Sequence, residues 1–399
     1  MKNKSSSKLF SVNNVQGFSL AFSIFLFLYP SFLWDSIVFV TPIAFGLLMF
    51  SIIIEALIKK NLKISIYLIF FLLYLIYSNT IGIPISIDYF STPTIIAVLF
   101  LFLSPNTIYN SFLVFVKIFG IVLGLSLVIY LLKVTGIYSP NLISQIAPDG
   151  RVYQNYLLNA MWEGTINNAF YMSSGFYRFH AFLNEPGFIG TLSSLIIFAL
   201  RFDFRKNKIL YIYLVACLVS MSLASYLVLF VGLMYFISIR KIILISIPVL
   251  VLVMFNMELF ERFILSRLNV ENGNISGDNR TSAAFDKKWE SLLGKSTIII
   301  GVGKGQHIVG SVDGGVSSWK SLVYNSGIIG FILYCLIFIS IYYSINNNHN
   351  KYSILFLLVF LLTIYHRPNI HNIYYLLILI GGLMNNIVLS NKIKLKNES

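Results

Sequence analysis

Long runs of apolar residues recur from position 18 to the end of this chain. A helix needs about 20 predominantly apolar residues to cross the hydrocarbon core of a bilayer. Only 11% of the residues are charged, against about 25% in a typical soluble domain. The sequence therefore predicts an all-α fold, a polytopic bundle of transmembrane helices.

The apolar runs predict about twelve transmembrane helices, which together form one membrane domain over residues 1–399. The two runs 209–222 and 223–239 are also compatible with one long tilted helix, 209–239. The expected spans are 18–34, 37–58, 64–84, 89–103, 110–132, 188–200, 209–222, 223–239, 242–257, 322–345, 352–365 and 373–389.

Lysines and arginines gather in alternate short loops between these runs, which is typical of cytoplasmic loops. This pattern predicts that both termini are cytoplasmic and that two long loops, 133–187 and 258–320, lie outside. It also explains the net charge of +14 without a nucleic-acid partner. Within the spans, Glu55 is the main ionisable residue, and we expect it to snorkel with Lys59 at the cytoplasmic face.

The first long loop ends in a mixed charged segment immediately before an apolar run. Arg178, His180 and Glu185 fall within eight residues and are followed by Pro186 and Gly187. Anchoring to lipid phosphate is one explanation of such a segment. A permanent cation, an imidazole and a carboxylate so close together also suit a catalytic or binding site.

The second long loop contains a predicted amphipathic helix. Phe285, Trp289 and Leu292 fall on one helical face, and Gly294 is placed to end the helix. The polar residues Arg280, Lys287 and Lys288 fall elsewhere on it or near its start. Further polar candidates in the outer segments are Lys304, within Gly301-Val302-Gly303-Lys304, and His366, Arg367 and His371.

No spacing of His, Cys, Asp or Glu in this sequence is typical of a metal site. We therefore expect neither a metal nor another cofactor.

At these residues the chain resembles the O-antigen and capsule repeat-unit polymerases, the Wzy-type family, which shares an architecture with the O-antigen ligases. The resemblance covers the plan of spans and loops. It is carried by Arg178 with Glu185-Pro186-Gly187, and by Arg280, Trp289, Gly301-Val302-Gly303 and Gly327-Ile328-Ile329-Gly330. It implies a glycosyltransferase C-like membrane fold.

The resemblance implies a metal-independent glycosyltransferase of the bacterial cytoplasmic (inner) membrane, acting in lipopolysaccharide O-antigen or capsule biosynthesis. Its substrates would be oligosaccharide repeats linked to polyprenyl (undecaprenyl) pyrophosphate. Besides these, the expected partners are membrane lipids and a chain-length regulator, with no nucleic acid.

Chemistry of this kind needs cations for the pyrophosphate leaving group and a base for the attacking hydroxyl. Arg178 and Arg280 are the expected catalytic cations, with Arg367 as a third candidate. Glu185 is the expected base, and His180, His366 and His371 compete for that role. The expected substrate-binding residues are Tyr177, His180, Asn184, Lys287, Lys288, Lys304, His366, Arg367 and His371.

Two other functions remain open at this point. A ligase would use the same donor with a different acceptor. A non-enzymatic flippase or transporter of lipid-linked sugars would instead place ionisable residues or broken helices inside the membrane.

Overall fold

The protein is mostly helical. The computed structural model describes residues 12–59, 64–81, 91–147, 150–162, 177–237, 270–271, 274–275, 283–304, 318–346, 350–366 and 372–398. Its contacts divide the chain into two compact units. Unit 1 comprises residues 1–60, 104–244 and 377–399, and unit 2 comprises residues 61–103 and 245–376.

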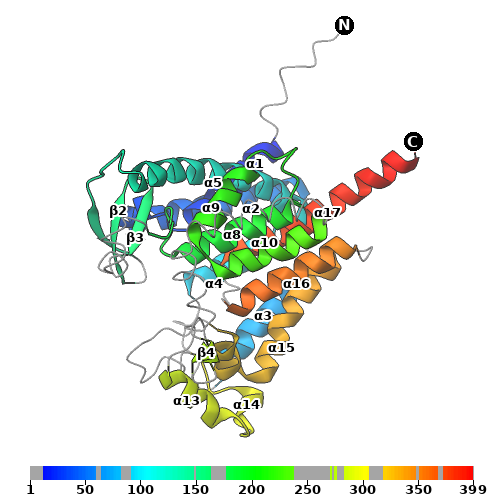
Figure 1. The fold of residues 1–399 in the computed structure, drawn as a ribbon. Helices are drawn as coiled ribbons and strands as arrows, with labels where there is room; N and C mark the ends of the chain where they lie inside the picture. The colour runs from blue at the N-terminus through cyan, green and yellow to red at the C-terminus, as the bar shows by residue number, and fades with distance from the viewer. Residues whose placement is uncertain are drawn as a thin grey trace. The chain divides into compact units, whose positions relative to one another are not determined.

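Unit 1 is built mainly from apolar helices. These are α1 (Val12–Leu26), the 3-10 helix η1 (Ser31–Ser36), α2 (Ile37–Lys59), α5 (Pro105–Val134), α8 (Pro186–Ala199), α9 (Leu210–Ser220), α10 (Leu223–Phe236) and the greater part of α17 (Ile373–Glu398). Helix α5 packs against α1 and α9, and α8 packs against α9 and α10. Figure 1 shows these helices side by side, with β2 and β3 near one end of α5.

Unit 2 centres on α15 (Trp319–Ile345), which packs against α3, α13, α14 and α16. Its other elements are α3 (Ile66–Thr80), α4 (Thr92–Leu101), β4 (Val270–Glu271), β5 (Asn274–Ile275), α13 (Ala283–Leu292), α14 (Thr297–Ile300) and α16 (Lys351–His366). The predicted amphipathic helix is confirmed as α13. Phe285 and Leu292 are buried, and Gly294 has a φ of 83° just beyond the end of the helix.

The prediction of a helical membrane protein is consistent with these elements. Among the described residues, four helical segments are long and apolar enough to cross a membrane: Ser31–Ile58, Pro105–Val134, Trp319–Ile345 and Ile373–Asn391. The other apolar helices are shorter, and the expected span 242–257 lies outside the described residues. The count of twelve spans thus stays a prediction. Helices α9 and α10 are separate, because Met221 adopts a left-handed conformation between them.

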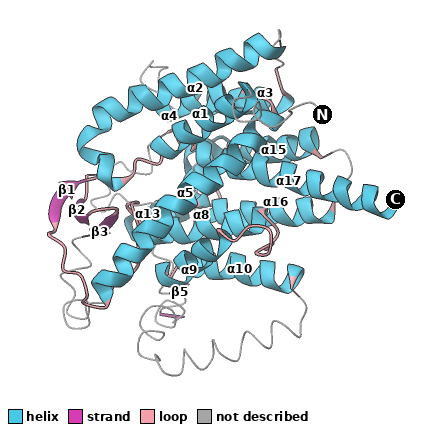
Figure 2. Ribbon diagram, turned by 90° about the horizontal axis from the view of Figure 1, so that it is seen from above, coloured by secondary structure: helices cyan, strands magenta, loops and turns pink. Residues whose placement is uncertain are grey.

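The all-α prediction missed a small antiparallel sheet inside the expected first loop. Strands β1 (Ile143–Ile146), β2 (Val152–Tyr156) and β3 (Asn159–Trp162) pair in the order β1-β2-β3. Figure 2 shows the three strands together in magenta. Trp34 packs with Tyr153, Ala147 and Ala160 beneath them. The strands are only four or five residues long, too short for a clear alternating pattern.

Glu55 is buried, so the expected snorkelling position is wrong. Only 2% of the residue is exposed. Its carboxylate accepts hydrogen bonds from Thr107 Oγ1 at 2.6 Å, Gln16 Nε2 at 2.9 Å and the backbone N–H of Ser104 at 3.3 Å. These donors lie on α1 and at the start of α5. A buried carboxylate is stable only when such donors replace water, so the network holds α1, α2 and α5 together.

We predict that Glu55→Ala lowers the free energy of unfolding by about 3 kcal/mol, because it leaves buried donors without their acceptor. Thermal unfolding of the purified chain in detergent measures this effect. The matched control is Asp203→Ala, whose carboxylate pairs at 3.0 Å with the exposed Lys206 and should cost about 1 kcal/mol or less. Equal losses in the two variants would contradict the network.

Candidate functional site

The segment 177–185 leads directly into α8 and is held by several elements of unit 1. Phe179 and Phe182 are fully buried within it. Its backbone bonds are Ala160 N–H to the Ala181 carbonyl at 2.7 Å, Ser31 N–H to the Phe182 carbonyl at 2.8 Å, and Phe179 N–H to the Val219 carbonyl at 3.1 Å. The segment is therefore a fixed platform for the charged residues that the sequence singled out.

Arg178 is engaged with the end of helix α9. Its Nε atom donates to the Ser220 carbonyl and its Nη2 atom to the Met221 carbonyl, each at 3.0 Å. A helix end presents carbonyls and a partial negative charge, which a guanidinium satisfies well. This contact gives Arg178 a role in fixing the segment, whatever it does for a substrate.

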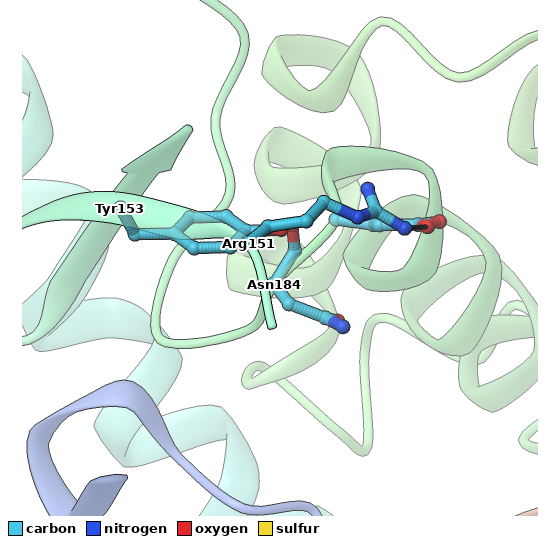
Figure 3. Close-up of polar contacts among 4 residues, drawn as sticks. Arg151, Tyr153 and Asn184 are labelled. Carbon is cyan, nitrogen blue, oxygen red and sulfur yellow. Dashed lines mark hydrogen bonds and ion pairs between the residues drawn. The ribbon is translucent and has the colours of Figure 1, made fainter. Parts of the chain in front are cut away.

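Glu185 pairs with Arg151, a residue that the sequence did not single out. Arg151 Nη2 lies 3.4 Å from Glu185 Oε1, and these side chains are 45% and 28% exposed. Beside them, the Tyr153 hydroxyl donates to the Asn184 carbonyl at 2.7 Å, and Figure 3 shows these contacts. The pair thus places a cation and a carboxylate together at the surface of unit 1.

The start of α8 and the sheet hold this pair from two sides. Glu185 is the N-cap residue of α8, and Pro186 occupies the first turn, where its fixed φ favours the helix. Arg151 lies immediately before β2, with its guanidinium carbon 6.0 Å from the centroid of the Trp162 ring. The only sequence signal for Arg151 was that Arg151 and Arg178 are the two arginines of the expected loop 133–187.

His180 is buried, at 3% exposure. Burial first, and then the charge of Arg178, lowers the pKa of His180 to about 3. The charges of Glu185 and Arg151 also act on this imidazole, in opposite directions. Within the described part of the chain, its Nδ1 atom has no hydrogen-bond partner. His180 is consequently a weak base at neutral pH, whereas Glu185 is partly exposed.

Tyr177 is locked into the interior of unit 1. Its carbonyl accepts a hydrogen bond from the Tyr130 hydroxyl at 2.7 Å, and its hydroxyl bonds to that of Tyr156. The Lys133 ammonium lies 4.5 Å from the centroid of its ring. Because the residue is only 4% exposed, its evident role is to fix the start of the segment.

In unit 2, the expected glycine motifs meet at a break in α15. Gly327 interrupts that helix with a φ of 68° and a ψ of −177°. Next to the break, the Tyr324 carbonyl accepts from Val302 N–H at 2.9 Å and the Asn325 carbonyl from Gly303 N–H at 3.0 Å. Backbone from outside the helix thus satisfies carbonyls at the point where the helix is broken.

Lys304 directly follows Val302 and Gly303, whose contact with the break in α15 we call the glycine crossing. Its Nζ atom donates to Asn79 Oδ1 at 2.9 Å, while the Tyr77 hydroxyl donates to the Ile300 carbonyl at 3.1 Å. The residue is exposed at the surface, and partial burial lowers the pKa of Lys304. Lys304 therefore presents a cation at the end of α3.

The remaining expected site residues are less well placed or lie outside the described residues. Lys287 is exposed and Lys288 partly exposed on α13. Arg280, Arg367 and His371 lie outside the described residues, and of His366 only the backbone, at the end of α16, is described. No group of three or more His, Cys, Asp or Glu residues that could hold a metal occurs in the described ranges.

The buried imidazole makes stability depend on pH. The pKa of His180 is lower in the folded chain than its ordinary value of 6.5, so the unfolded chain binds the extra proton as pH falls below 6.5. The wild-type chain should therefore lose stability as the pH falls from 6.5 to 4. We predict that this loss is smaller by roughly 3 kcal/mol in His180→Gln, which has no imidazole to protonate. Thermal unfolding of both proteins across that range tests this, and identical pH profiles would contradict it.

The glycine crossing can be tested by a matched pair of substitutions. A Cβ atom on Gly327 would lie 2.3 Å from the Ile299 carbonyl oxygen, whereas one on Gly136, whose φ is also positive, meets nothing within 4 Å. We predict a loss of about 3 kcal/mol for Gly327→Ala and about 1 kcal/mol for Gly136→Ala. Thermal unfolding measures both values. Equal losses would contradict the close packing of Gly327 against the backbone of residues 299–301.

Comparisons of the chain with family models, with curated proteins and with solved structures found no match. The function is therefore inferred from the residues of the site.

Proposed function

We propose that this chain is a membrane-embedded, metal-independent glycosyltransferase that polymerises lipid-linked oligosaccharide repeats. It transfers a growing glycan from a polyprenyl pyrophosphate to a hydroxyl of the acceptor repeat. The apolar helices support a substrate that arrives through the lipid phase. We place the site on the outer side of a bacterial cytoplasmic membrane, in accordance with the distribution of lysines and arginines.

The observation that carries the proposal is the Arg151–Glu185 pair at the start of α8. Glycosyl transfer of this kind forms one C–O bond from the acceptor hydroxyl to the sugar and breaks the C–O bond to pyrophosphate. Glu185 accepts the proton of the attacking hydroxyl, and the lipid pyrophosphate leaves with the bonding electrons. A guanidinium beside the carboxylate stabilises the charge that develops on that leaving group.

The burial of His180 favours Glu185 over this histidine as the base. An imidazole with a pKa of about 3 rarely accepts a proton at neutral pH, and buried side chains do not reach a sugar hydroxyl. In this proposal His180 is a buried residue that packs near Tyr153, and Arg178 fixes the segment through the end of α9.

A flippase of lipid-linked sugars is the second candidate, because two observations favour it. Glu55 is an ionisable residue buried among apolar helices, and α15 is broken at Gly327. Both features occur in transporters. However, Glu55 is bonded to donors from two other helical segments, and backbone groups occupy the carbonyls at the break. We therefore give both features a structural role.

Complementation of a polymerase-deficient strain tests the proposal, with the glycan read as a ladder on a gel. We predict that Glu185→Gln leaves a single repeat attached, because the amide cannot accept the proton, while Asp203→Asn retains full ladders. Immunoblots of the membrane fraction confirm equal amounts of both proteins. Full ladders from Glu185→Gln would contradict a base at this position. Loss of all external repeats on deletion of the chain would favour the flippase.

A further inference from the structure

We propose that Arg151 binds the diphosphate of the donor and that Glu185 occupies Arg151 until this anion arrives. The diphosphate then replaces the Glu185 carboxylate on the Arg151 guanidinium, so that binding of the anion also releases the base. This inference rests on the proposed function, since it assigns a part of the substrate to one residue of that site.

The position of Arg151 suits such an exchange. The guanidinium has the Glu185 carboxylate on one side, at 3.4 Å, and the Trp162 ring on another, 6.0 Å from the centroid. Nearly half of the Arg151 side chain is exposed, and the carboxylate is the less exposed partner. An anion from solvent or from the lipid surface therefore reaches the guanidinium without opening the core.

The present partner of Arg151 is easily displaced. Exposed ion pairs contribute little to stability, because water and salt screen them. A diphosphate carries more charge than a carboxylate and can take two parallel hydrogen bonds from one guanidinium. The Trp162 ring supports the arginine by a cation–π contact while its other partner changes.

Glu185 keeps its place when its cation is lost. Its backbone carbonyl accepts from Phe188 N–H at 3.1 Å and from Ile189 N–H at 3.4 Å, within the first turn of α8. A carboxylate without a neighbouring cation holds a proton more strongly. The exposed Arg151 from the start of β2 is in direct contact with this carboxylate. The charge of Glu185 also acts on the buried His180 of its own segment.

The exchange has a consequence for the order of events. Before the donor binds, Glu185 is paired with Arg151 and is a poor base. After the diphosphate takes Arg151, the same carboxylate is ready to accept the proton of the acceptor hydroxyl. The site thus activates the acceptor only when the donor is present.

Binding of inorganic pyrophosphate to the purified full-length chain in detergent, measured by calorimetry without divalent metals, tests the exchange. We predict that Glu185→Gln tightens binding by about three- to tenfold, because it removes an internal competitor worth as much as a modest ion pair. Arg151→Gln should weaken binding by about tenfold or more. Asp203→Asn, the same change beside the exposed Lys206, should leave binding unchanged.

Unchanged or weaker binding by Glu185→Gln would overturn the competition, and wild-type binding by Arg151→Gln would overturn the assignment of the anion site. Thermal unfolding confirms that each variant is folded. The outcome is separable from that of the proposed function. If Glu185→Gln binds pyrophosphate more tightly and still makes full ladders, the exchange stands and the base assignment fails.

Discussion

Every backbone N–H and C=O group in an apolar environment needs a partner within the protein. Regular helices provide these partners internally. The backbone groups that need partners from elsewhere in the chain are therefore those where helices end or break. At the end of α9, the guanidinium of Arg178 takes two carbonyls. At the break in α15, Val302 and Gly303 supply N–H groups to two others. Each interruption therefore ties a loop segment to the neighbouring helices, and Glu185 and Lys304 belong to those segments.

The segment 177–185 is the part of unit 1 that such contacts fix most completely among those described. Its aromatic side chains are buried and its backbone is bonded to η1, β3 and the end of α9, so little freedom is left to lose when a substrate binds. Apart from the partly buried Arg178, the accessible part lies at its end, where Glu185 meets Arg151. In the proposed function, a fixed carboxylate beside a partly exposed guanidinium suits a reaction that releases diphosphate.

Much of the helical part of this fold could be predicted from the sequence, because long apolar runs have few alternatives. The helix that carries Phe285 was also predictable, since its apolar spacing and Gly294 agree. The sheet was missed because its strands are short and its second hairpin turns at Leu157, which has a φ of 47° and no glycine signal. The turn signal Pro148-Asp149-Gly150 between the first two strands was present in the sequence. The partner of Glu185 was missed as well, since Arg151 lies on a separate strand-forming segment and no local spacing relates the two.

The proposed function requires that the Arg151–Glu185 pair faces away from the cytoplasm. The most direct measurement is labelling of a single cysteine at Ser144, an exposed position of β1 in the same loop, after replacement of Cys217 and Cys335. A membrane-impermeant maleimide is applied to intact cells and to permeabilised cells. If the loop lies outside, labelling is equal in intact and in permeabilised cells. Labelling only after permeabilisation would place the loop in the cytoplasm and contradict the proposed function.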